Sequence, residues 1–366
     1  MRRRSHRYSY LDGDTSFFGR IFPSLAALLV LTTSIFMALF LFISNPARAQ
    51  EYSGGAAVLK LAYFGSQQDA VFTEVIRPWA EAINTDGAGL IRIDTHPGGD
   101  LGRNPRLQLK LVETGKAHIV WHQPEYTPGR FPDNEVIELP ATTNNAQEAS
   151  VVFRRLYERD LLRGYEDFYV PLLAATQPYT IHTTKRVAAI ADFKGMKLRA
   201  DGAIAGAAMR ALGAVPVGMP VAAVAENLNG GVLAGATGEW CMLFEHRIVE
   251  AATHHYMAPL GAAPVMMVMD KKTFGALPKR AQDIIRKHSG ENLTKRFAQV
   301  HLARQRVRLS QAQKMDGHDF FFPDGAAQSA WDRAMKPVIE DWVKKHPKGE
   351  ELYAALTQEL DRYRGY

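Results

Sequence analysis

The sequence contains a single cysteine, Cys241, among its 366 residues, so no disulfide can form within the chain. Several enzyme signatures are also missing. No serine lies in a G-x-S-x-G segment, no H-E-x-x-H occurs, and residues 114–117 (Thr-Gly-Lys-Ala) lack the upstream glycine and the following hydroxyl residue of a phosphate-binding loop. The glycines of residues 96–102 are wrongly spaced for a dinucleotide fingerprint. The sequence therefore gives no support for nucleotide binding, and a hydrophobic core alone must stabilise the fold.

The first 49 residues are predicted to be an export signal rather than part of the fold. Arginines at positions 2, 3, 4, 7 and 20 precede an apolar run over residues 21–43, and Ala47-Arg48-Ala49 fits the small-x-small rule, so we expect cleavage before Gln50. The run of about 23 residues would also span a bilayer, which leaves an uncleaved membrane anchor open as an alternative. Both interpretations place the globular part outside the cytoplasm.

The positive charge of the chain belongs mostly to this leader. The whole sequence has 44 basic and 38 acidic residues, and the leader holds six and two of them, which leaves 38 and 36 for residues 50–366. A net charge of +2 provides no basic footprint, so we expect no nucleic-acid partner. The remaining 317 residues predict two domains or one large α/β unit.

Strand-like and helix-like segments alternate along the chain. Strands are predicted at 58–64, 90–95, 117–121, 170–175, 196–198, 214–217, 265–270 and 319–322. Helices are predicted at 70–83, 106–114, 146–162, 203–212, 221–228, from Pro278 toward Met315, and after Ala326. This alternation indicates an α/β fold with a largely parallel sheet, and a second run of strands and helices from about Thr180 indicates two lobes with a cleft between them.

Arg199 follows the predicted strand 196–198 directly and is the leading candidate for a ligand contact. Residues just beyond the carboxyl end of a strand face the crevice where ligands bind in open α/β sheets. A guanidinium presents a planar fork that matches a carboxylate, whereas a surface salt bridge is the competing interpretation. By the same reasoning Phe64 and Gln67 follow one strand, and Gln123 follows another.

Glu239 and Trp240 end a further strand-to-helix turn and are predicted to line the same cleft. His246, Glu250 and His254 lie four residues apart, which would place zinc-compatible ligands on one helical face. The sequence places no fourth ligand there, and charged neighbours favour an ordinary solvated surface. We therefore predict no metal site and no cofactor.

The ordered series of segments resembles the solute-binding subunits of TRAP (tripartite ATP-independent periplasmic) transporters over residues 57–345. The segments that carry this resemblance are THPGGDLG (95–102), LVETGKAHIV (111–120), IADFKGMKLR (190–199), LGAVPVGMP (212–220), GVLAG (231–235) and LPKRAQDII (277–285). The resemblance implies a two-lobe fold like that of periplasmic binding proteins, with crossing strands and a long connecting helix, which closes over a small ligand. It implies a first lobe of residues 57–177 plus 263–312, and a second lobe of 178–262 plus 313–366 that includes the C-terminal helices.

The resemblance also implies roles for particular residues. Arg199 matches the arginine that grips the carboxylate of an organic acid in this family. Ala234 stands where the family usually has an aspartate, and Tyr179 stands where many members carry an arginine. The carboxylate anchor is thus kept while its surroundings differ, and Tyr179 with Trp240 is expected to cover the rest of the ligand.

The sequence therefore predicts a non-catalytic extracytoplasmic receptor that delivers an organic acid to the membrane permease subunits of a TRAP transporter. An alternative is a membrane-anchored ligand-sensing domain, in which the leader is retained. A further alternative is a periplasmic enzyme on the same scaffold that uses Glu239 or His122 as a base. The sequence leaves open whether the chain forms a homodimer.

Overall fold

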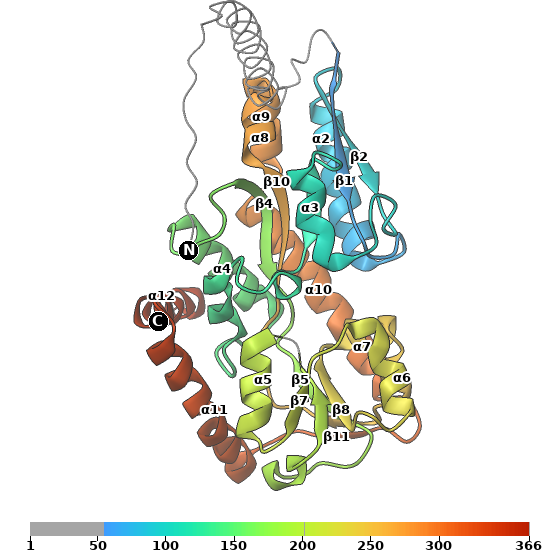
Figure 1. The fold of residues 1–366 in the computed structure, drawn as a ribbon, viewed down its shortest axis with the longest axis vertical. Helices are drawn as coiled ribbons and strands as arrows, with labels where there is room; N and C mark the ends of the chain where they lie inside the picture. Colours follow the sequence, from blue (N-terminus) through green and yellow to red (C-terminus); the bar gives the residue numbers. More distant parts are fainter. Residues whose placement is uncertain (1–54, 201, 366) are drawn as a thin grey trace, which may run out of the picture. The chain divides into compact units, whose positions relative to one another are not determined.

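The computed structural model describes residues 55–200 and 202–365. The predicted leader and its cleavage point before Gln50 lie outside the described residues. Residues 52–366 form one compact unit that contains two β-sheets (Figure 1). The structure thus has the mixed α/β architecture with two sheets that the sequence predicts. Among the described residues, no helix is both long enough and apolar enough to cross a membrane.

The first sheet has the strand order β2-β1-β3-β10-β4. Its strands are β1 (Ala57–Ala62), β2 (Ile91–His96), β3 (Ile119–His122), β4 (Phe168–Ala175) and β10 (Pro264–Asp270). β1 runs parallel to β2 and β3, whereas β10 runs antiparallel to β3 and β4. Helices cover both faces, so the central strands β3 and β10 are apolar and almost fully buried.

The segments that accompany the first sheet include the helices predicted at 70–83, 106–114 and 146–162, together with shorter segments that were not predicted. They are η1 (Phe72–Ile76), α2 (Arg77–Asp86), η2 (Pro105–Leu107), α3 (Gln108–Glu113), η3 (Pro124–Tyr126), η4 (Pro132–Glu138), α4 (Ala146–Glu158), α8 (Lys271–Ala276) and α9 (Lys279–Lys287). Local chemistry sets some of these ends. Asn145 caps α4, because its side chain accepts hydrogen bonds from the N–H groups of Gln147 and Glu148.

The second sheet has the order β11-β9-β5-β8-β6-β7. Its strands are β5 (Thr180–Thr183), β6 (Lys197–Arg199), β7 (Val215–Val217), β8 (Gly235–Gly238), β9 (His254–Tyr256) and β11 (Asp319–Phe321). The segments α5 (Gly202–Ala211), η6 (Val221–Ala223), α6 (Val224–Asn229), α7 (Trp240–Glu245) and η7 (Ile248–Glu250) accompany them. β5 is antiparallel to β8 and β9, while the pairs β6/β7, β6/β8 and β9/β11 are parallel.

Both sheets are therefore mixed, but each contains only one strand that runs against the others, β10 in the first sheet and β5 in the second, so the prediction of a largely parallel sheet is confirmed apart from these two strands. The physical reason for the two exceptions lies in two segments that pass from one sheet to the other without a crossover helix, residues 176–179 and 257–263. The first segment leads from β4 into β5 and the second from β9 into β10, and both β5 and β10 run against their neighbours. The two segments also bind each other: the N–H of Tyr179 donates to Gly261 O (3.0 Å), and the N–H of Leu260 donates to Tyr179 O (2.8 Å).

The helix α10 (Glu291–Ala312) contacts elements of both sheets. Phe297 lies in the core that packs on the first sheet, and Ala312 lies in a core with residues of α6 and α7. The sequence predicts one helical region from Pro278 toward Met315. Instead, α9 ends before Gly290, whose positive φ of 76° begins α10 in a new direction.

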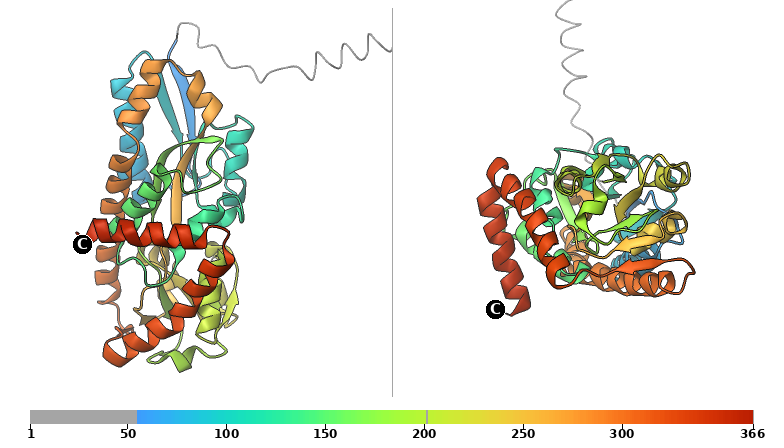
Figure 2. Two further views of the ribbon diagram at one scale, coloured as in Figure 1. Left: turned by 90° about the vertical axis from the view of Figure 1, so that its left-hand side faces the viewer. Right: turned by 90° about the horizontal axis from the view of Figure 1, so that it is seen from below.

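The C-terminal helices α11 (Gly325–Lys345) and α12 (Gly349–Arg364) pack on different parts of the unit (Figure 2). α11 contacts α5 and places Trp331 in the core of the second sheet. α12 contacts α4 and places Leu352 and Leu356 in the core of the first sheet. The predicted lobe ranges remain a proposal. They assign α12 to the second lobe, whereas these contacts favour the first lobe for this helix.

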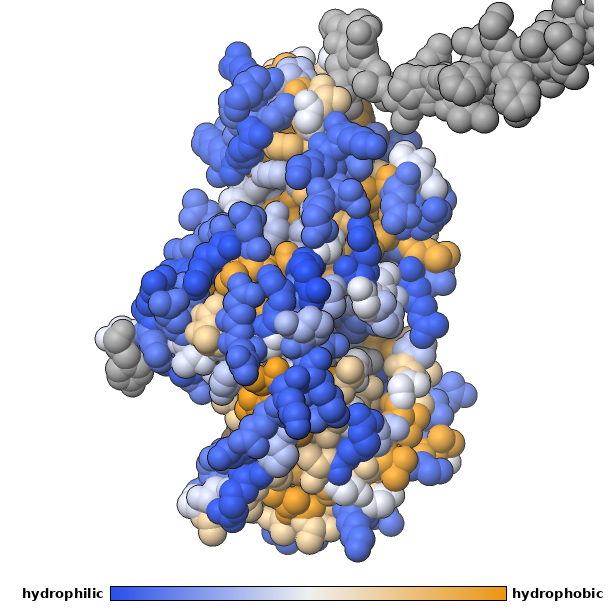
Figure 3. Space-filling model, turned by 60° about the vertical axis from the view of Figure 1, so that its left-hand side comes forward, coloured by the Kyte–Doolittle hydropathy of each residue, from blue (hydrophilic) through white to orange (hydrophobic). Residues whose placement is uncertain are grey.

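The surface of the described residues is mainly polar. On the face in Figure 3, hydrophilic side chains cover most of the area and apolar ones lie between them. The large apolar side chains that are exposed, such as Leu107 and Phe322, belong to separate elements. Such scattered apolar residues are normal for a folded protein.

Candidate functional site

A cavity of about 630 Å³ lies where the two sheets and α10 meet. Residues that follow β1 and β3 line it from the first sheet, and Arg199 and the helix α7 line it from the second. Thr176 and Tyr179 contribute from a crossing segment, and residues between Phe297 and Arg308 contribute from α10. Because both sheets and the segments that join them form its walls, this cavity is the candidate functional site.

The structure brings five of the seven predicted contact residues together in this cavity. They are Phe64, Gln123, Tyr179, Arg199 and Glu239. The structure places the other two predicted residues elsewhere.

Trp240 is the first residue of α7, and its buried ring packs against His182, His255 and Phe320, away from the cavity. Gln67 lies exposed in the loop after β1, where its neighbours Ser66 and Gln68 line the cavity instead. Both residues were predicted from their positions after a strand, and such a position does not determine whether the side chain points into the cavity or away from it.

Arg199 ends β6 and has no exposed surface. Its Nε donates to the backbone oxygen of Met219 (3.3 Å), and its Nη1 lies 4.0 Å from the sulfur of Met242. Burial and the nearby Arg199 charge both lower the pKa of His246, another lining residue. The guanidinium is thus shielded from water, and a charge in such surroundings interacts strongly with an opposite charge.

Two other arginines line the cavity from α10, but both are differently placed. Arg304 forms an ion pair with Glu74 and keeps 48% of its side chain exposed. Arg308 lies over the ring of Phe244, and its Nη1 donates to the side-chain oxygen of Gln311. Neither is as fully desolvated as Arg199, so Arg199 is the strongest candidate for an anion anchor.

Aromatic rings form much of the cavity wall. The lining aromatic residues are Tyr63, Phe64, Trp121, Tyr126, Tyr179 and Phe297. Several contact one another: the ring centres of Tyr63 and Trp121 are 5.9 Å apart, as are those of Trp121 and Phe297. These flat apolar surfaces suit a ligand with a planar apolar body.

Three carboxyl groups near one another also line the cavity. Burial raises the pKa of Glu239 to about 7, although the N–H groups of Met242 and Cys241 donate to its carboxylate and lower it. The pKa of Glu245 rises to about 8, first through poor hydration and then through the charges of Asp69 and Glu239. Burial also raises the pKa of Asp69, which accepts a hydrogen bond from Tyr63. Glu239 and Glu245 are therefore partly protonated near neutral pH.

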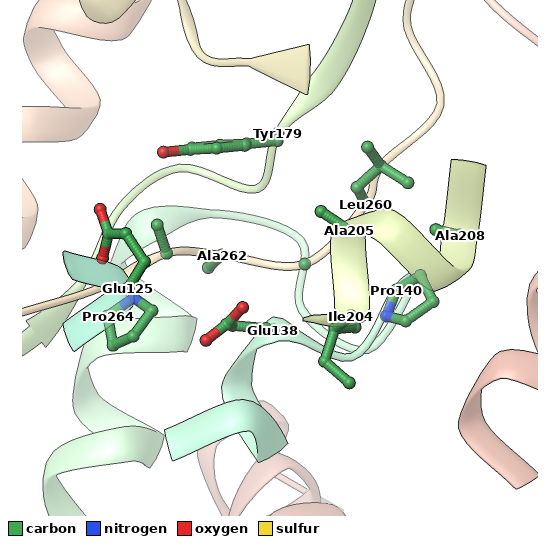
Figure 4. A pocket seen from close by; sticks show the side chains of 12 residues that line it. Glu125, Glu138, Pro140, Tyr179, Ile204, Ala205, Ala208, Leu260, Ala262 and Pro264 are labelled. Atoms are coloured by element: carbon green, nitrogen blue, oxygen red, sulfur yellow. The ribbon is translucent and has the colours of Figure 1, made fainter. Parts of the chain in front are cut away.

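A second, much smaller cavity of about 30 Å³ adjoins the first (Figure 4). Glu125 and Tyr179 line both cavities, while Glu138 and apolar residues such as Ala205 and Leu260 line only the small one. Its lining is mainly apolar. Tyr179 therefore lies between the candidate site and this smaller cavity.

The structure offers no alternative metal centre among the residues that it describes. His246 directly follows α7, Glu250 lies in the turn η7, and His254 begins β9. Arg247, with a positive φ of 55°, interrupts the helix between them. The three side chains therefore do not share the single helical face that their spacing suggested.

Sequence reasoning missed the contribution of α10 to the cavity. Phe297, His301, Arg304 and Arg308 follow one another at spacings of three or four residues, so they lie along one side of the helix. The signal was present, because His301 and Gln305 are polar residues on the stripe that Phe297 marks as buried. Polar residues that interrupt an apolar helical stripe are a recognisable pattern, and this pattern could have identified His301 and Gln305.

Comparisons with known proteins agree with this geometry. The model of the family described as bacterial extracellular solute-binding protein, family 7, matches residues 61–346. A marine metagenome TRAP solute-binding protein specific for aromatic acids, solved with metahydroxyphenylacetate, is 26% identical, covers 84% of this chain and 99% of its own, and has a TM-score of 0.78.

A TRAP solute-binding protein from Rhodoferax ferrireducens, solved with copurified benzoate, is 25% identical and also has a TM-score of 0.78. The alignment covers 85% of this chain and 99% of that one. Among curated proteins, the outer membrane transporter protein TsaT of Comamonas testosteroni is 24% identical over 283 residues, which are 76% of this chain and 82% of that protein.

Proposed function

The chain belongs to the bacterial extracellular solute-binding proteins of family 7, the substrate-binding proteins of TRAP transporters, and from this we propose that it binds aromatic carboxylates outside the cytoplasm. In this proposal the protein is a receptor without a catalytic role. It captures the acid and delivers it to a membrane permease. The relatives are receptors rather than enzymes, which supports the non-catalytic interpretation.

One observation carries the proposal: a fully buried arginine stands in the wall of a cavity whose other walls are rich in aromatic rings. The Arg199 guanidinium would hold the carboxylate, with a geometry that a planar fork fits well. Tyr63, Trp121 and Phe297 would contact the aromatic body. Two relatives with similar folds bind metahydroxyphenylacetate and benzoate, which both combine one carboxylate with one aromatic ring.

Binding would require the two lobes to separate and close again. Arg199 has no exposed surface, so a ligand can reach it only after the walls around it move. The two crossing segments, held together by the backbone bonds between Tyr179 and the residues 260–261, are the natural hinge. Closure would then remove water from the ion pair and strengthen it.

The family implies an extracytoplasmic location. We propose that the leader is cleaved before Gln50, which would release the receptor into the periplasm. A mass measurement of the exported protein tests this. A mass that corresponds to residues 50–366 supports free diffusion, whereas the mass of the whole chain would support the membrane-anchored alternative.

The central experiment is native mass spectrometry of the exported protein, followed by denaturation and identification of any released compound. Isothermal titration with benzoate, metahydroxyphenylacetate and succinate then compares aromatic acids with an aliphatic dicarboxylate. The proposal expects an aromatic acid to bind most tightly and to be recovered unchanged after incubation. Preferred binding of succinate would refute the aromatic specificity, and chemical conversion of the bound acid would refute the receptor role.

A further inference from the structure

His301 has a buried polar side chain in the cavity wall, and it has no part in the carboxylate binding proposed for Arg199. It lies on α10 and is only 7% exposed. Its ring stacks on Phe297, with ring centres 5.4 Å apart and planes 12° apart. This packing fixes the ring against the aromatic wall of the cavity.

Hydrogen bonds determine which nitrogen of His301 carries the proton. The backbone N–H of Trp240, which can only donate, gives a hydrogen bond to the side-chain oxygen of Gln305 (2.8 Å). The amide of Gln305 is therefore oriented with its nitrogen toward His301, and this Nε2 lies 3.2 Å from the imidazole Nε2. Because an amide nitrogen donates and does not accept, His301 Nε2 must be the acceptor.

A neutral imidazole that accepts at Nε2 carries its proton on Nδ1. Burial lowers the pKa of His301 to about 4, so the ring is neutral at ordinary periplasmic pH. Within the described part of the chain, no hydrogen bond engages Nδ1. The two hydrogen bonds, from the N–H of Trp240 to Gln305 and from Gln305 to His301, thus orient the His301 ring. The ring keeps an uncharged Nδ1–H donor at the cavity wall.

We propose that His301 recognises an uncharged oxygen substituent of the ligand, a hydroxyl or carbonyl group separate from the carboxylate, through a hydrogen bond from Nδ1–H. This inference rests on the proposed function and narrows its ligand class to oxygen-substituted aromatic carboxylates. Arg199 lies on the wall formed by the second sheet, whereas His301 stacks on Phe297, which in turn packs against Trp121. The two groups therefore act on different parts of one ligand. Gln305 is a positioning residue that acts through His301.

The test compares benzoate with its three monohydroxy isomers by isothermal titration. The wild-type protein is expected to bind at least one hydroxybenzoate more tightly than benzoate. His301→Phe keeps the stacked ring and removes the donor, so it is expected to lower that preference roughly threefold to tenfold while benzoate affinity stays within about twofold. His301→Asn retains an N–H donor and is expected to keep part of the preference.

A second experiment tests the tautomer of His301 directly. A purely structural role of this residue would not depend on which ring nitrogen carries the proton. Long-range proton–nitrogen NMR spectra of the wild type are expected to show His301 protonated at Nδ1. Gln305→Met keeps the side-chain volume and removes both hydrogen bonds, so a mixture of tautomers and a weaker hydroxybenzoate preference are expected.

The outcomes separate this inference from the proposal on which it rests. If benzoate binds but no isomer binds better, or if His301→Phe weakens all four acids equally, the role of His301 is overturned and the receptor function stands. An Nε2-protonated ring in the wild type would also overturn it. If none of the four acids binds the wild-type protein, the aromatic-acid function fails, and this inference fails with it.

Discussion

Replacing Arg199 with alanine is expected to weaken the binding of benzoate by at least about a hundredfold. The guanidinium has no exposed surface, so in the closed complex both it and the carboxylate would be removed from water. Removing one partner of a buried ion pair leaves the other charge uncompensated and typically costs about 3–5 kcal/mol. Since about 1.4 kcal/mol corresponds to a tenfold change in affinity, the lower limit already exceeds a hundredfold.

Isothermal titration at neutral pH measures this effect, with thermal unfolding as a check that each variant folds. Arg199→Lys keeps the charge but loses the planar fork, so we expect an affinity between those of the wild type and the alanine variant. Arg210→Ala is the matched control. This arginine is exposed on α5 outside the cavity, and its removal should leave the affinity unchanged.

An unchanged dissociation constant in a folded Arg199→Ala protein would refute the reasoning. If Arg308→Ala abolished binding instead, the carboxylate anchor would lie on α10. The partial exposure of Arg308 would then have been the wrong reason to prefer Arg199 as the anchor.

Three further predictions concern stability. Burial lowers the pKa of His182 to about 3 and that of His255 to about 2, so the unfolded chain binds more protons below its ordinary histidine pKa of about 6.5. The contribution of each histidine to the unfolding free energy should be fully retained above that pH and fall as the pH drops below it, by up to about 1.4 kcal/mol per pH unit. The raised pKa values of Glu239 and Glu245 act in the opposite direction, so denaturant titrations at pH 7 and pH 5 compare the wild type with His255→Phe; a variant with the same pH dependence as the wild type would contradict this. Gly261→Ala should lower the melting temperature, because its Cβ would lie 1.8 Å from the backbone oxygen of Glu138, whereas Gly275→Ala, with nothing within 4 Å, should not. Trp331→Ala should cost about 3–5 kcal/mol in chemical denaturation, because the ring is fully buried; a loss below about 1 kcal/mol would show that the core closes around the gap.

Most elements of the fold follow from local patterns. The alternation of β1, α2 and β2 could be predicted because apolar spacing and turn residues act within a few positions of the chain. The short strand β9 (His254–Tyr256) was not predicted. Two of its three residues are histidines, and the strand forms through pairing with β5 and β11, which no local pattern encodes.

The candidate site divides in the same way. Arg199 was predicted because the end of a strand in an α/β sheet has a defined relation to the ligand crevice. Trp240 was misplaced because its direction is set by His182 and His255, which come from two other strands. His301 had a local signal, a polar residue on an apolar stripe, but only the tertiary structure shows that α10 lies beside α7 and that this side of the helix faces the cavity.

The sequence by itself determined the α/β class, the family and the position of Arg199 at a strand end, because each depends on the order of residues along the chain. The export leader remains a prediction from the same kind of pattern. Tertiary structure decided the antiparallel insertion of β5 and β10, the aromatic wall of the cavity and the hydrogen-bonded series from Trp240 through Gln305 to His301. These features join residues that lie far apart in sequence. Their geometry depends on how packed elements meet, which the spacing of residues does not specify.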